Sequence, residues 1–503
     1  MSLSIVCTRA QVGISAPLVN VEVHLSGGLP SFSIVGLPET AVKESRERVR
    51  SALINSGFDF PQRRITVNLA PADLPKEGGR YDLAIAVGIL AASGQVSLES
   101  IADAEFLGEL ALSGEIRPVS GVLPAALACK AVGKQLYIAD QNQPDAMKAK
   151  GLVIYSLQHL LKLSAHLTGT EKLPSQIGTG HAVEMSRSYP DLSDVKGQFQ
   201  AKRALEIAAA GAHNILLVGP PGSGKSMLAN RLPGLLPVMT EEECIEVAVI
   251  ESVAHVRQHS QSSQRPFRAP HHTASSVALV GGGGNPKPGE ISLAHQGVLF
   301  LDELPEFSRQ VLEVLREPME TGEILISRAA GQTLFPSRFQ LVTAMNPCPC
   351  GYFSDGSDRC RCSPDQVRRY QSRVSGPLLD RIDIQLTVQA VSQKDLMNIT
   401  DTAESTATVR ERVLESRSRQ LVRQAGPNQL LQGKALERHC HLAERDQSLL
   451  ADAMERLHLS ARAYHRILRV ARTIADLAGQ DRIEQAHLLE ALSYRVSGKE
   501  MLQ

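Results

Sequence analysis

Short apolar runs alternate along the chain with longer stretches in which apolar residues have helical spacing. This pattern predicts a mixed α/β protein. The short apolar runs predict strands and the longer patterns predict helices in the first third of the chain. From residue 396 onward the pattern is helical and rich in Arg and Glu. The predicted strands of the first third are 21–25, 32–35, 65–69 and 135–139, and its predicted helices are 40–56, 82–93 and 121–132.

These patterns divide the chain into four parts. A polar stretch rich in Gly, Ser and Thr separates the first α+β region from the next, and such a composition is typical of a linker. We therefore predict a front domain, a linker, a nucleotide-binding core with a parallel sheet and a helical C-terminal lid, at residues 1–167, 168–189, 190–395 and 396–503.

The most informative motif joins an apolar run, Ile215–Val218, to the pattern Gly-x-x-x-x-Gly-Lys-Ser. Glycines let the backbone turn tightly so that its N–H groups face a phosphate, and the following helix adds positive potential. We expect Lys225 to hold the outer phosphates of ATP and Ser226 to hold Mg²⁺; an ordinary glycine-rich turn is the alternative. The predicted nucleotide-binding residues are Gly219, Pro220, Pro221, Gly222, Ser223, Gly224, Lys225 and Ser226.

Two further apolar runs end in polar side chains. The run at 297–301 is followed by Asp302 and Glu303, and the run at 339–345 by Asn346. Asp302 suits an outer-sphere contact to Mg²⁺, Glu303 suits activation of the attacking water, and Asn346 suits positioning of that water. A strand followed by a helix-capping acid is the alternative for Asp302 and Glu303. Beside the phosphate loop, the pattern favours ATP hydrolysis.

Composition limits the possible settings of this activity. At 503 residues the chain is long enough for about three domains. With 43% hydrophobic and 21% charged residues it is typical of a globular protein, and no apolar run reaches the roughly 18 residues that span a membrane. Because the N-terminus lacks the features of a signal peptide, we expect a cytoplasmic protein without a membrane partner. The formal net charge is zero, so any nucleic-acid surface must be local.

Four of the eight cysteines are clustered directly after Asn346, as Cys348-Pro-Cys350 and Cys360-Arg-Cys362. Four thiolates in two pairs suit a tetrahedral zinc site, and in a cytosolic chain this is favoured over two disulfides. The Cys-x-Cys spacing is tighter than the usual two-residue gap, so redox-active or purely structural thiols are the alternatives. A bound metal would brace the loop that carries Asn346.

Several longer motifs resemble those of the magnesium-chelatase-like AAA+ group, and more specifically the ComM/YifB family. The resemblance covers essentially the whole chain and implies a hexameric ring motor, similar to a helicase, that drives branch migration during homologous recombination. It implies single-stranded and branched DNA as partners, recombinase machinery as a further partner, and integration of incoming DNA in natural transformation. The motifs are Asp191-Leu-Ser-Asp-Val-Lys-Gly-Gln, the phosphate loop, Phe267-Arg-Ala-Pro-His-His-Thr273, Pro288-Gly-Glu-Ile-Ser-Leu-Ala-His295 and Asn346-Pro-Cys-Pro-Cys-Gly351.

The resemblance also implies roles for arginines. The segment from Ser375 to Arg381 looks like the one that presents an arginine finger to the ATP of a neighbouring subunit, which requires an oligomer. Arg373 is the alternative finger, and a surface salt bridge of Arg381 with Asp380 or Asp383 is the structural alternative. In the lid, Arg462 is expected to contact ATP, with Arg466 and Arg469 as alternatives on the same helix.

Two inserts would distinguish this clade. Residues 251–296 carry Arg265, Arg268, Lys287 and the pair His271-His272, and 323–338 predict a hairpin that turns at Gly331-Gln332. In related ring motors such hairpins line the central pore, where Arg and Lys would grip phosphates. Subunit or ATP contacts are the alternative for Arg328 and Arg338. For His271-His272 we favour a structural or interface role, because adjacent side chains rarely chelate one ion.

The front domain resembles the protease domain of Lon-type enzymes, a ribosomal S5 domain 2-like fold, in the motifs 77–83 and 108–122. Those enzymes need a Ser nucleophile and a Lys base. Tyr81 or a neighbour stands where the Ser is expected, and Leu123-Pro124 where the Lys is expected. We therefore predict a non-proteolytic domain that caps the ring or binds DNA. Its basic residues suit DNA or a solvated helix face, and they are Lys43, Arg46, Arg48, Arg50, Arg63 and Arg64.

Three functions from different classes remain. A DNA motor would show DNA-stimulated ATPase activity. A metal-inserting chelatase subunit shares the core motifs, but the Lon-like front domain and the four-cysteine loop are not expected of it. An ATP-dependent protease is disfavoured by the missing Ser and Lys. The sequence therefore favours the DNA motor, with a chelatase-like or protein-remodelling ATPase as the alternative.

Overall fold

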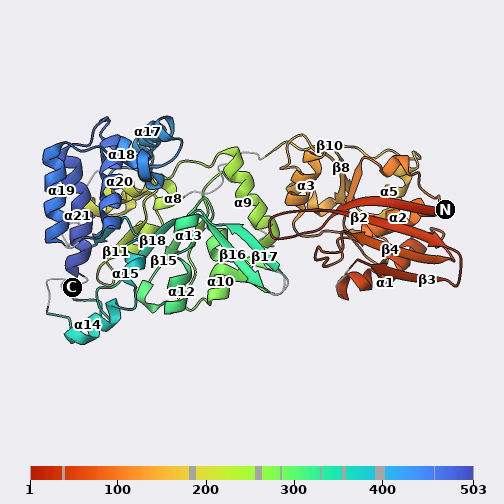
Figure 1. Ribbon diagram of the computed structural model, residues 1–503, viewed down its shortest axis with the longest axis horizontal. Helices are drawn as coiled ribbons and strands as arrows, with labels where there is room; N and C mark the ends of the chain where they lie inside the picture. Colours follow the sequence, from red (N-terminus) through yellow and green to blue (C-terminus); the bar gives the residue numbers. More distant parts are fainter. Residues whose placement is uncertain are drawn as a thin grey trace.

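Two β-sheets organise the chain and lie one beyond the other along its long axis (Figure 1). An eight-stranded sheet takes its strands from residues 2–177, and a five-stranded sheet from residues 267–387 together with 215–218. Helices among the described residues are too short or too polar to cross a membrane. The computed structural model describes residues 2–36, 40–180, 189–254, 263–283, 286–328, 331–353, 358–390, 403–457 and 459–501.

The front sheet has the strand order β10-β9-β8-β5-β1-β2-β4-β3 and mixes parallel and antiparallel pairs. A separate two-stranded ribbon joins β6 and β7. The strands are β1 Ser2–Arg9, β2 Leu18–Ser26, β3 Ser31–Val35, β4 Arg64–Ala70, β5 Ala104–Leu107, β6 Glu109–Leu110, β7 Ile116–Arg117, β8 Gln135–Ala139, β9 Val153–Leu157 and β10 Gln176–Ile177.

One helix of the front domain, α2, is buried along its entire length. Its sequence, Asp82 to Ala92, is almost wholly apolar, and a helix that is hydrophobic on all sides has no face to offer to water. Asp82, at its start, is paired with Arg48 of α1 at 2.7 Å. The helices here are α1 Thr40–Asn55, α2 Asp82–Ala92, α3 Val122–Ala131, α4 Gln143–Ala146 and α5 Leu160–Leu167.

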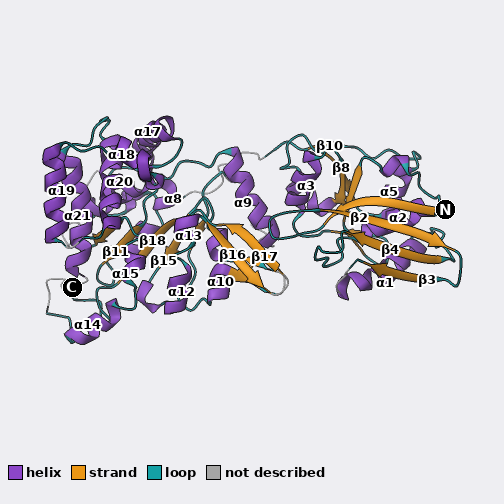
Figure 2. Ribbon diagram, in the orientation of Figure 1, coloured by secondary structure: helices purple, strands orange, loops and turns teal. Residues whose placement is uncertain are grey.

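The five-stranded sheet is parallel throughout, in the order β12-β15-β18-β11-β19. Figure 2 shows three of its strands, β11, β18 and β15, side by side. All residues of β11, β15 and β18 are buried, as expected for central strands of a parallel sheet that is covered on both faces. Because the strands are parallel, their carboxyl ends meet at one edge. The strands are β11 Ile215–Val218, β12 Phe267–Arg268, β15 Val298–Leu301, β18 Gln340–Met345 and β19 Ile384–Thr387.

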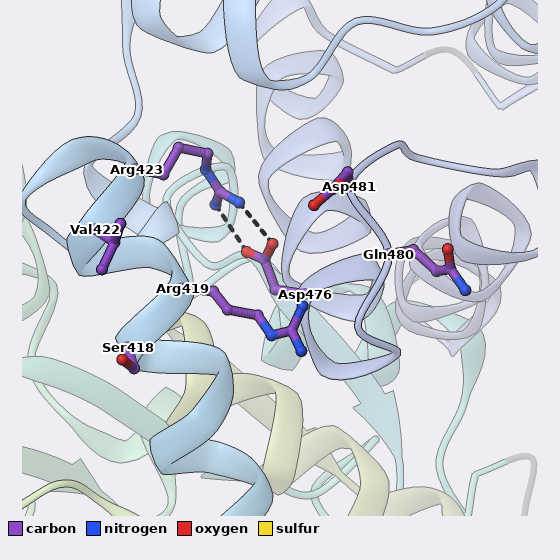
Figure 3. Close-up of a pocket in the computed structure, with 7 residues that line it drawn as sticks. All are labelled: Ser418, Arg419, Val422, Arg423, Asp476, Gln480 and Asp481. Atoms are coloured by element: carbon purple, nitrogen blue, oxygen red, sulfur yellow. Dashed lines mark hydrogen bonds and ion pairs between the residues drawn. The ribbon is translucent and has the colours of Figure 1, made fainter.

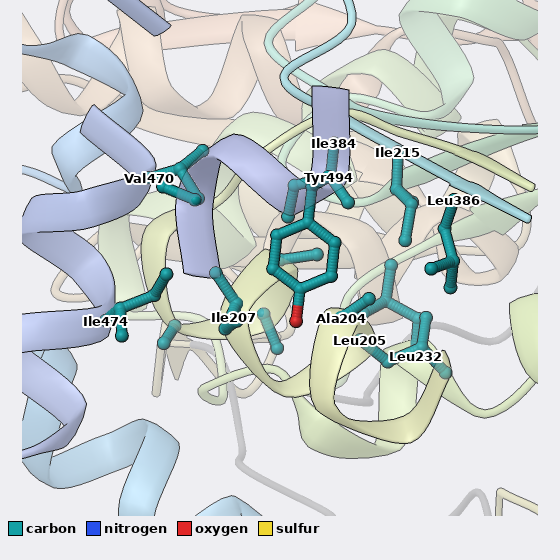
Figure 4. Packing of buried hydrophobic residues seen from close by; sticks show 14 of the residues in the cluster. Ala204, Leu205, Ile207, Ile215, Leu232, Ile384, Leu386, Val470, Ile474 and Tyr494 are labelled. Carbon is teal, nitrogen blue, oxygen red and sulfur yellow. The ribbon is translucent and has the colours of Figure 1, made fainter. Parts of the chain in front are cut away.

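Side chains of these strands alternate between two hydrophobic cores. On β11, Ile215 and Leu217 enter the core shared with the C-terminal helices, whereas Leu216 and Val218 enter the core on the opposite face. Figure 4 shows the first of these cores, where Tyr494 lies among side chains of the sheet and helices. The helices of this region are α6 Phe199–Gly211, α7 Lys225–Ala229, α8 Leu232–Leu235, α9 Glu241–Ala254, α10 Ser276–Val280, α11 Glu290–Leu293, α12 Arg309–Val314, α13 Pro318–Thr321, α14 Pro364–Gln371 and α15 Gly376–Leu379.

Two hairpins project from this core. Strands β16 Glu323–Arg328 and β17 Gly331–Pro336 pair antiparallel, and β13 Gly281–Gly282 pairs with β14 Lys287–Pro288. The predicted turn at Gly331-Gln332 is wrong, because these two residues belong to β17 and pair with Arg328 and Ser327. The alternating apolar and polar residues predict the two strands correctly. The predicted turn lies two residues too late because the strands are not joined by a Gly-Xaa pair.

The C-terminal region is helical, and it packs on α6 and β19 (Figure 1). A buried charged network fastens it to the core: Arg466 of α20 donates to Asp383 at 2.8 Å, and Arg495 of α21 donates to the carbonyl of Ile382. The helices are α17 Thr406–Gln424, α18 Gly433–His439, α19 Glu444–Arg456, α20 Ala461–Leu477 and α21 Gln485–Met501.

The front domain contacts the region around the five-stranded sheet through α9 and through the hairpin β16–β17, and Lys150 also pairs with Glu241 of α9 at 3.8 Å. Leu123 of α3 is buried against Ala248 and Val249 of α9, and the amide of Gly121 donates to the carbonyl of Ser252 at 3.2 Å. The turn after β1 touches the hairpin, since a Cβ on Gly13 would lie 2.3 Å from Thr333 of β17. The predicted linker at 168–189 is not wholly irregular, because β10 within it extends the front sheet.

Candidate ATP-binding and hydrolysis site

The phosphate loop lies between β11 and α7, as the sequence predicts. Gly222 and Gly224 have φ values of 75° and 88°, which favour glycine because other residues are strained there. Gly219 allows close packing, since a Cβ there would lie 2.2 Å from the carbonyl oxygen of Val388. The loop therefore has the tight turn and the helix start that an anion-binding site needs.

Lys225 is the first residue of α7 and is 8% exposed. Its Nζ donates to the carbonyl oxygens of Gly219 and Pro220 at 2.8 and 2.9 Å, and to Oδ1 of Asn346 at 3.1 Å. Burial lowers the pKa of Lys225, while the charges of Asp302 and Glu303 oppose this change. The structure thus brings together the predicted lysine and the polar residue that follows β18.

The predicted Mg²⁺ ligands also lie together. Ser226 Oγ donates to Oδ2 of Asp302 at 2.6 Å, across the gap between α7 and the end of β15. Oxygen atoms of a hydroxyl and a carboxylate are ligands that Mg²⁺ accepts, and the ion is usually held by one or two carboxylates with water and phosphate. The donor set therefore fits Mg²⁺ next to the phosphate loop.

Glu303 follows Asp302 in a left-handed conformation, with φ 53°. Its amide donates to Oδ1 of Asp302 at 2.9 Å, and its side chain is 52% exposed. The carboxylate oxygen Oε2 lies 3.0 Å from Nδ1 of His272. A water-activating role requires such an accessible carboxylate beside the Mg²⁺ ligands.

Sequence reasoning missed the contact between His272 and Glu303. Strand β12 lies beside β15, with Arg268 opposite Leu299. His272 comes four residues after Arg268, and Glu303 comes four residues after Leu299. The signal was therefore a matter of register between two parallel strands. It was not recognised because β12 has only two residues and shows no periodic pattern.

The segment from Asp191 to Gln198, before α6, adjoins the phosphate loop. Gln198 has φ 54°, and its Nε2 donates to the carbonyls of Ser223 and Gln389 at 3.2 and 2.6 Å. Asp191 accepts hydrogen bonds from the amides of Ser193 and Thr406, which ties the segment to the start of α17. These contacts place the segment next to the phosphate loop and the C-terminal helices.

The two candidate finger arginines differ in accessibility. Arg381 is 5% exposed and forms an ion pair with Glu320 of its own chain, and its Nη1 donates to the carbonyl of Pro377. The side chain of Arg373 is 54% exposed and pairs with Glu306 at 3.1 Å. Arg373 is thus the one better placed to reach a neighbouring subunit without leaving a buried site.

The three lid arginines also separate. Arg466 is bonded to the carbonyl of Arg381 and to Asp383, and burial lowers the pKa of Arg469 beside the same carboxylate. Arg462 is exposed in the first turn of α20. Arg466 and Arg469 belong to the buried network that anchors the lid, so Arg462 is the one with freedom to approach a ligand.

The four clustered cysteines lie close enough to share one metal ion. Their sulfur atoms lie within 4.8 Å of one another, with separations of 3.3, 3.9 and 3.7 Å among Cys348, Cys350 and Cys360. A tetrahedral zinc site with Zn–S bonds of about 2.3 Å requires sulfur atoms about 3.8 Å apart. The cluster, completed by Cys362, therefore fits zinc.

This cysteine loop packs directly against the phosphate loop. Gly351 has φ 86°, and a Cβ there would lie 2.5 Å from Cδ of Pro221. Its amide donates to Sγ of Cys348 at 3.2 Å, and Gln371 of α14 donates to the carbonyl of Pro347 at 3.0 Å. The loop thus connects the cysteine cluster, Asn346 and the phosphate loop.

Two basic residues of the first insert do not face outward as expected for phosphate contacts. Arg265 donates to Glu243 at 2.9 Å and to two backbone carbonyls, and Arg268 donates twice to Glu290 at 2.7 Å. Lys287 and Arg338 are exposed. The side chain of Arg328 lies outside the described part of the structure.

The positions that correspond to the protease residues are buried in the front domain. Tyr81 is fully buried before α2, and Leu123 and Pro124 lie in α3. Several of the basic residues of this domain have partners within it: Arg48 pairs with Asp82, and Arg50 lies over the ring of Phe60.

A pocket in the described C-terminal region lies between α17 and the end of α20 (Figure 3). Arg423 donates to both carboxylate oxygens of Asp476 at 2.7 and 2.8 Å, so the charges of these two residues are paired with each other. None of the predicted ATP-site residues lines it, which separates it from the nucleotide site. The lining residues are Ser418, Arg419, Val422, Arg423, Asp476, Gln480 and Asp481.

Comparisons with known proteins identify the family of the chain. The family profile described as magnesium chelatase, subunit ChlI, matches residues 191–396, and a profile for its C-terminal part matches residues 403–495. A profile described as subunit ChlI of Mg-chelatase matches residues 21–142. The front domain therefore does not distinguish this chain from chelatase subunits, contrary to our expectation. Fold and site together define a magnesium-chelatase-like AAA+ protein.

Full-length relatives narrow the family. The chain is 54% identical over 499 residues to competence protein ComM of Haemophilus influenzae, with 98% of each chain covered. It is 49% identical over 496 residues to the protein YifB of Escherichia coli. A magnesium-chelatase 38 kDa subunit of Cereibacter sphaeroides is 26% identical over 181 residues, which is 32% of this chain. The chain belongs to the ComM/YifB family.

Proposed function

We propose that this protein is an ATP-driven, ring-shaped DNA motor that promotes branch migration in homologous recombination, including integration of single-stranded DNA in natural transformation. One observation carries the proposal: an assembled ATP site occurs in a chain that matches a competence protein over 98% of its length. Competence concerns uptake of DNA, and an ATP-hydrolysing ring is suited to moving along it.

Each residue at the edge of the parallel sheet has a task in ATP hydrolysis. Lys225 neutralises charge on the outer phosphates. Ser226 would hold Mg²⁺ directly, and Asp302 would contact the ion through water. Glu303 orients the attacking water and accepts its proton at a carboxylate oxygen. Asn346, whose Oδ1 already contacts Lys225 Nζ, helps to fix the position of this water.

Assembly as a hexameric ring completes the site. An arginine from a neighbouring subunit stabilises charge that develops on the transferred phosphoryl group. The exposure of Arg373 supports this residue as the finger, with Arg381 as the alternative. Arg462 contacts the nucleotide from the lid, so that hydrolysis changes how the C-terminal helices sit on the core.

DNA lies along the projecting hairpins. The exposed Lys287 of β14 and Arg338, which follows β17, supply positive charge next to the two hairpins. Contacts to phosphate carry little sequence information and weaken steeply with salt. Single-stranded and branched DNA, with recombinase proteins as further partners, are therefore the expected ligands of this cytoplasmic protein.

The second candidate is a chelatase-like or protein-remodelling ATPase. The matches of the ChlI profiles favour it, because they extend over both the front domain and the core. However, the matches to the chelatase subunits of Cereibacter sphaeroides and Rhodobacter capsulatus are only 26% and 24% identical and cover 32% and 60% of this chain. The DNA motor is favoured because the full-length relative bears the name of a competence protein.

Zinc is the metal proposed for the four-cysteine cluster. It would hold Asn346 and the phosphate loop in a fixed relation through Gly351, as a structural ion without a role in the chemical step. Metal content of the purified protein tests this directly. About one zinc per chain supports the assignment, whereas metal-free protein with four titratable thiols and full ATPase activity contradicts it.

The proposed function is tested by ATP hydrolysis and DNA binding measured on the same preparation. Wild-type protein and Lys225→Ala are compared with single-stranded DNA, duplex DNA, a four-way junction and no DNA. The proposal predicts ATPase activity that DNA stimulates, and binding that falls as salt is raised. ATPase activity without DNA binding or stimulation would contradict it and favour the second candidate.

A further inference from the structure

We infer that the cysteine loop and α14 form a second DNA-contacting surface, which binds the phosphate backbone through exposed arginines. The inference rests on the proposed function for the identity of the ligand as DNA. The arginines themselves are a feature of the structure, because all four side chains are exposed. This α14 surface consists of Arg359, Arg361, Arg368 and Arg369.

The α14 surface lies apart from the hairpin that was assigned to DNA above. Helix α14 is at the outer edge of the core, away from β16 and β17 (Figure 1). A ligand that contacts both places must extend across the core or offer more than one strand. Branched DNA meets this requirement, because its arms and strands diverge.

Both ends of α14 are fixed to their surroundings. At the start, Ser363 Oγ accepts a hydrogen bond from the amide of Gln366, and the Gln366 side chain accepts one from the amide of Ser363 at 2.9 Å. At the end, Gln371 donates to the carbonyl of Pro347 in the cysteine loop at 3.0 Å. Tyr370 is buried on the inner side of the helix. The exposed arginines are therefore presented by a fixed helix.

The arginines are spread along this helix. Arg361 lies two residues before the N-cap Ser363, whereas Arg368 and Arg369 lie in the last turn. A helix of eight residues is about 12 Å long at about 1.5 Å per residue. Phosphates of one DNA strand are about 3.4 Å apart along the helix axis. The row of arginines thus matches about three or four successive phosphates.

The charges of the two α14 arginines are not taken up by carboxylates. Among the described residues, neither Arg368 nor Arg369 forms an ion pair, and Nε of Arg369 donates to the backbone carbonyl of Asp365 at 3.4 Å. The neighbouring Arg373, by contrast, pairs with Glu306 at 3.1 Å. Two guanidinium groups on the outside of α14 are therefore available to an anionic ligand.

The other two arginines lie next to the cysteine cluster. Arg359 and Arg361 flank Cys360 in the chain, and the guanidinium of Arg359 lies 4.4 Å from the centre of the Tyr352 ring. A zinc ion held by four thiolates keeps an excess of negative charge, which these two arginines offset. Arg368 and Arg369 consequently carry the charge that a ligand of the α14 surface would meet.

The composition of the surface favours phosphate over a protein partner. Protein–protein interfaces have an apolar centre. Among the residues that the structure describes, the exposed large apolar side chains nearest to α14 in sequence are Leu334 and Leu414. Arginine, in contrast, donates paired hydrogen bonds to phosphate oxygens, and such contacts do not depend on base sequence.

The test measures DNA affinity of the full-length protein by fluorescence anisotropy over a range of salt concentrations. Labelled single-stranded DNA, duplex DNA and a four-way junction are the probes. One double variant, Arg368→Gln with Arg369→Gln, removes both charges, and another, Arg368→Lys with Arg369→Lys, keeps them. The matched control, Lys434→Gln with Arg438→Gln, removes two exposed charges from α18 in the lid.

We expect the glutamine double variant to bind single-stranded DNA and the junction more weakly than wild type. The slope of log affinity against log salt should become less steep by about 1.4 on single strands, because each lost phosphate contact removes about 0.7. The lysine double variant should keep most of the slope, and the lid control all of it. Zinc content and ATP hydrolysis without DNA should equal those of wild type in every variant.

The duplex probe identifies the form of DNA that is bound. A loss confined to single strands and the junction assigns the surface to single-stranded backbone, and an equal loss on duplex assigns it to the backbone of either form. If the glutamine double variant misfolds, the single variants Arg368→Gln and Arg369→Gln replace it, and each should reduce the slope by about 0.7.

Other results would overturn the inference. Unchanged affinity and slope in the glutamine double variant would remove the α14 surface from DNA binding and leave the proposed function intact, because the wild type still binds DNA. Loss of DNA-independent ATP hydrolysis in that variant would assign the arginines to a contact between subunits. If the wild type binds none of the three probes, the proposed function fails and the inference fails with it.

Discussion

His213 provides a quantitative test of the joint between the core and the C-terminal helices. It is fully buried between α6 and β11, and its Nε2 lies 2.7 Å from Oγ1 of Thr473 on α20. Burial lowers its pKa from 6.5 to about 4; the charge of Asp383 opposes the change, and Arg469, Arg417 and Arg466 reinforce it. We predict that the free energy of unfolding falls less steeply in His213→Gln than in wild type as the pH is lowered.

The direction and size of this pH effect on the free energy of unfolding follow from proton linkage. Between pH 6.5 and 4 the unfolded chain binds a proton at His213 that the folded protein does not, so stability is lost as pH falls through this window. Each pH unit corresponds to about 1.4 kcal/mol, so the loss is about 2 kcal/mol at pH 5 and about 3 kcal/mol near pH 4. Asp383, whose pKa is lowered, contributes stability that is lost only below its unfolded value of 3.8.

The assay is urea unfolding of wild type and His213→Gln, followed by far-ultraviolet circular dichroism because the chain has no Trp. Glutamine is neutral throughout and can keep a hydrogen bond to Thr473. Other histidines titrate in both proteins, so the difference between the two isolates His213. We expect this difference to grow in favour of the variant by about 2 kcal/mol from pH 7.5 to 5. A difference that stays constant with pH would refute the reasoning.

Three further predictions concern the ATP site. Glu303→Gln should bind ATP and retain the assembled ring while hydrolysis falls at least about 100-fold, as size-exclusion and phosphate-release measurements would show; normal hydrolysis would remove Glu303 from its role. Cys348→Ser should lose bound zinc and weaken ATP binding through the contact of Gly351 with Pro221, and nucleotide titration checks this. Arg373→Ala should keep ATP affinity but lose activity, and mixing with Lys225→Ala subunits should restore part of it; no restoration would favour Arg381.

Much of the ATP site could be predicted from the sequence because its strands are buried on both faces. Continuous apolar runs that end in Gly219, Asp302 and Asn346 identify β11, β15 and β18, and parallel pairing brings their ends together. In the front domain the predicted elements match β2, β3, β4, β8, α1, α2 and α3 to within three residues at each end, whereas β1, β5, β6, β7, β9, β10, α4 and α5 were not predicted. Here local patterns and tertiary structure agree.

The rest depended on contacts between distant segments. Strand β12 is too short for a periodic signal, so the approach of His272 to Glu303 was not foreseen. Arg265 and Arg268 looked like phosphate ligands in sequence, but acidic partners 22 residues away engage both. The burial of Arg381 beside Glu320 could not be predicted from the sequence either, because the partner of a charged side chain depends on tertiary packing.

We propose that ATP turnover at this site moves DNA strands. A labelled four-way junction with homologous arms, incubated with ATP and either wild type or Lys225→Ala, tests it most directly. We predict that wild type converts the junction to duplex products, that Lys225→Ala does not, and that the conversion requires hydrolysable ATP. Junctions that bind to the wild type and remain unconverted during normal ATP hydrolysis would contradict the claim.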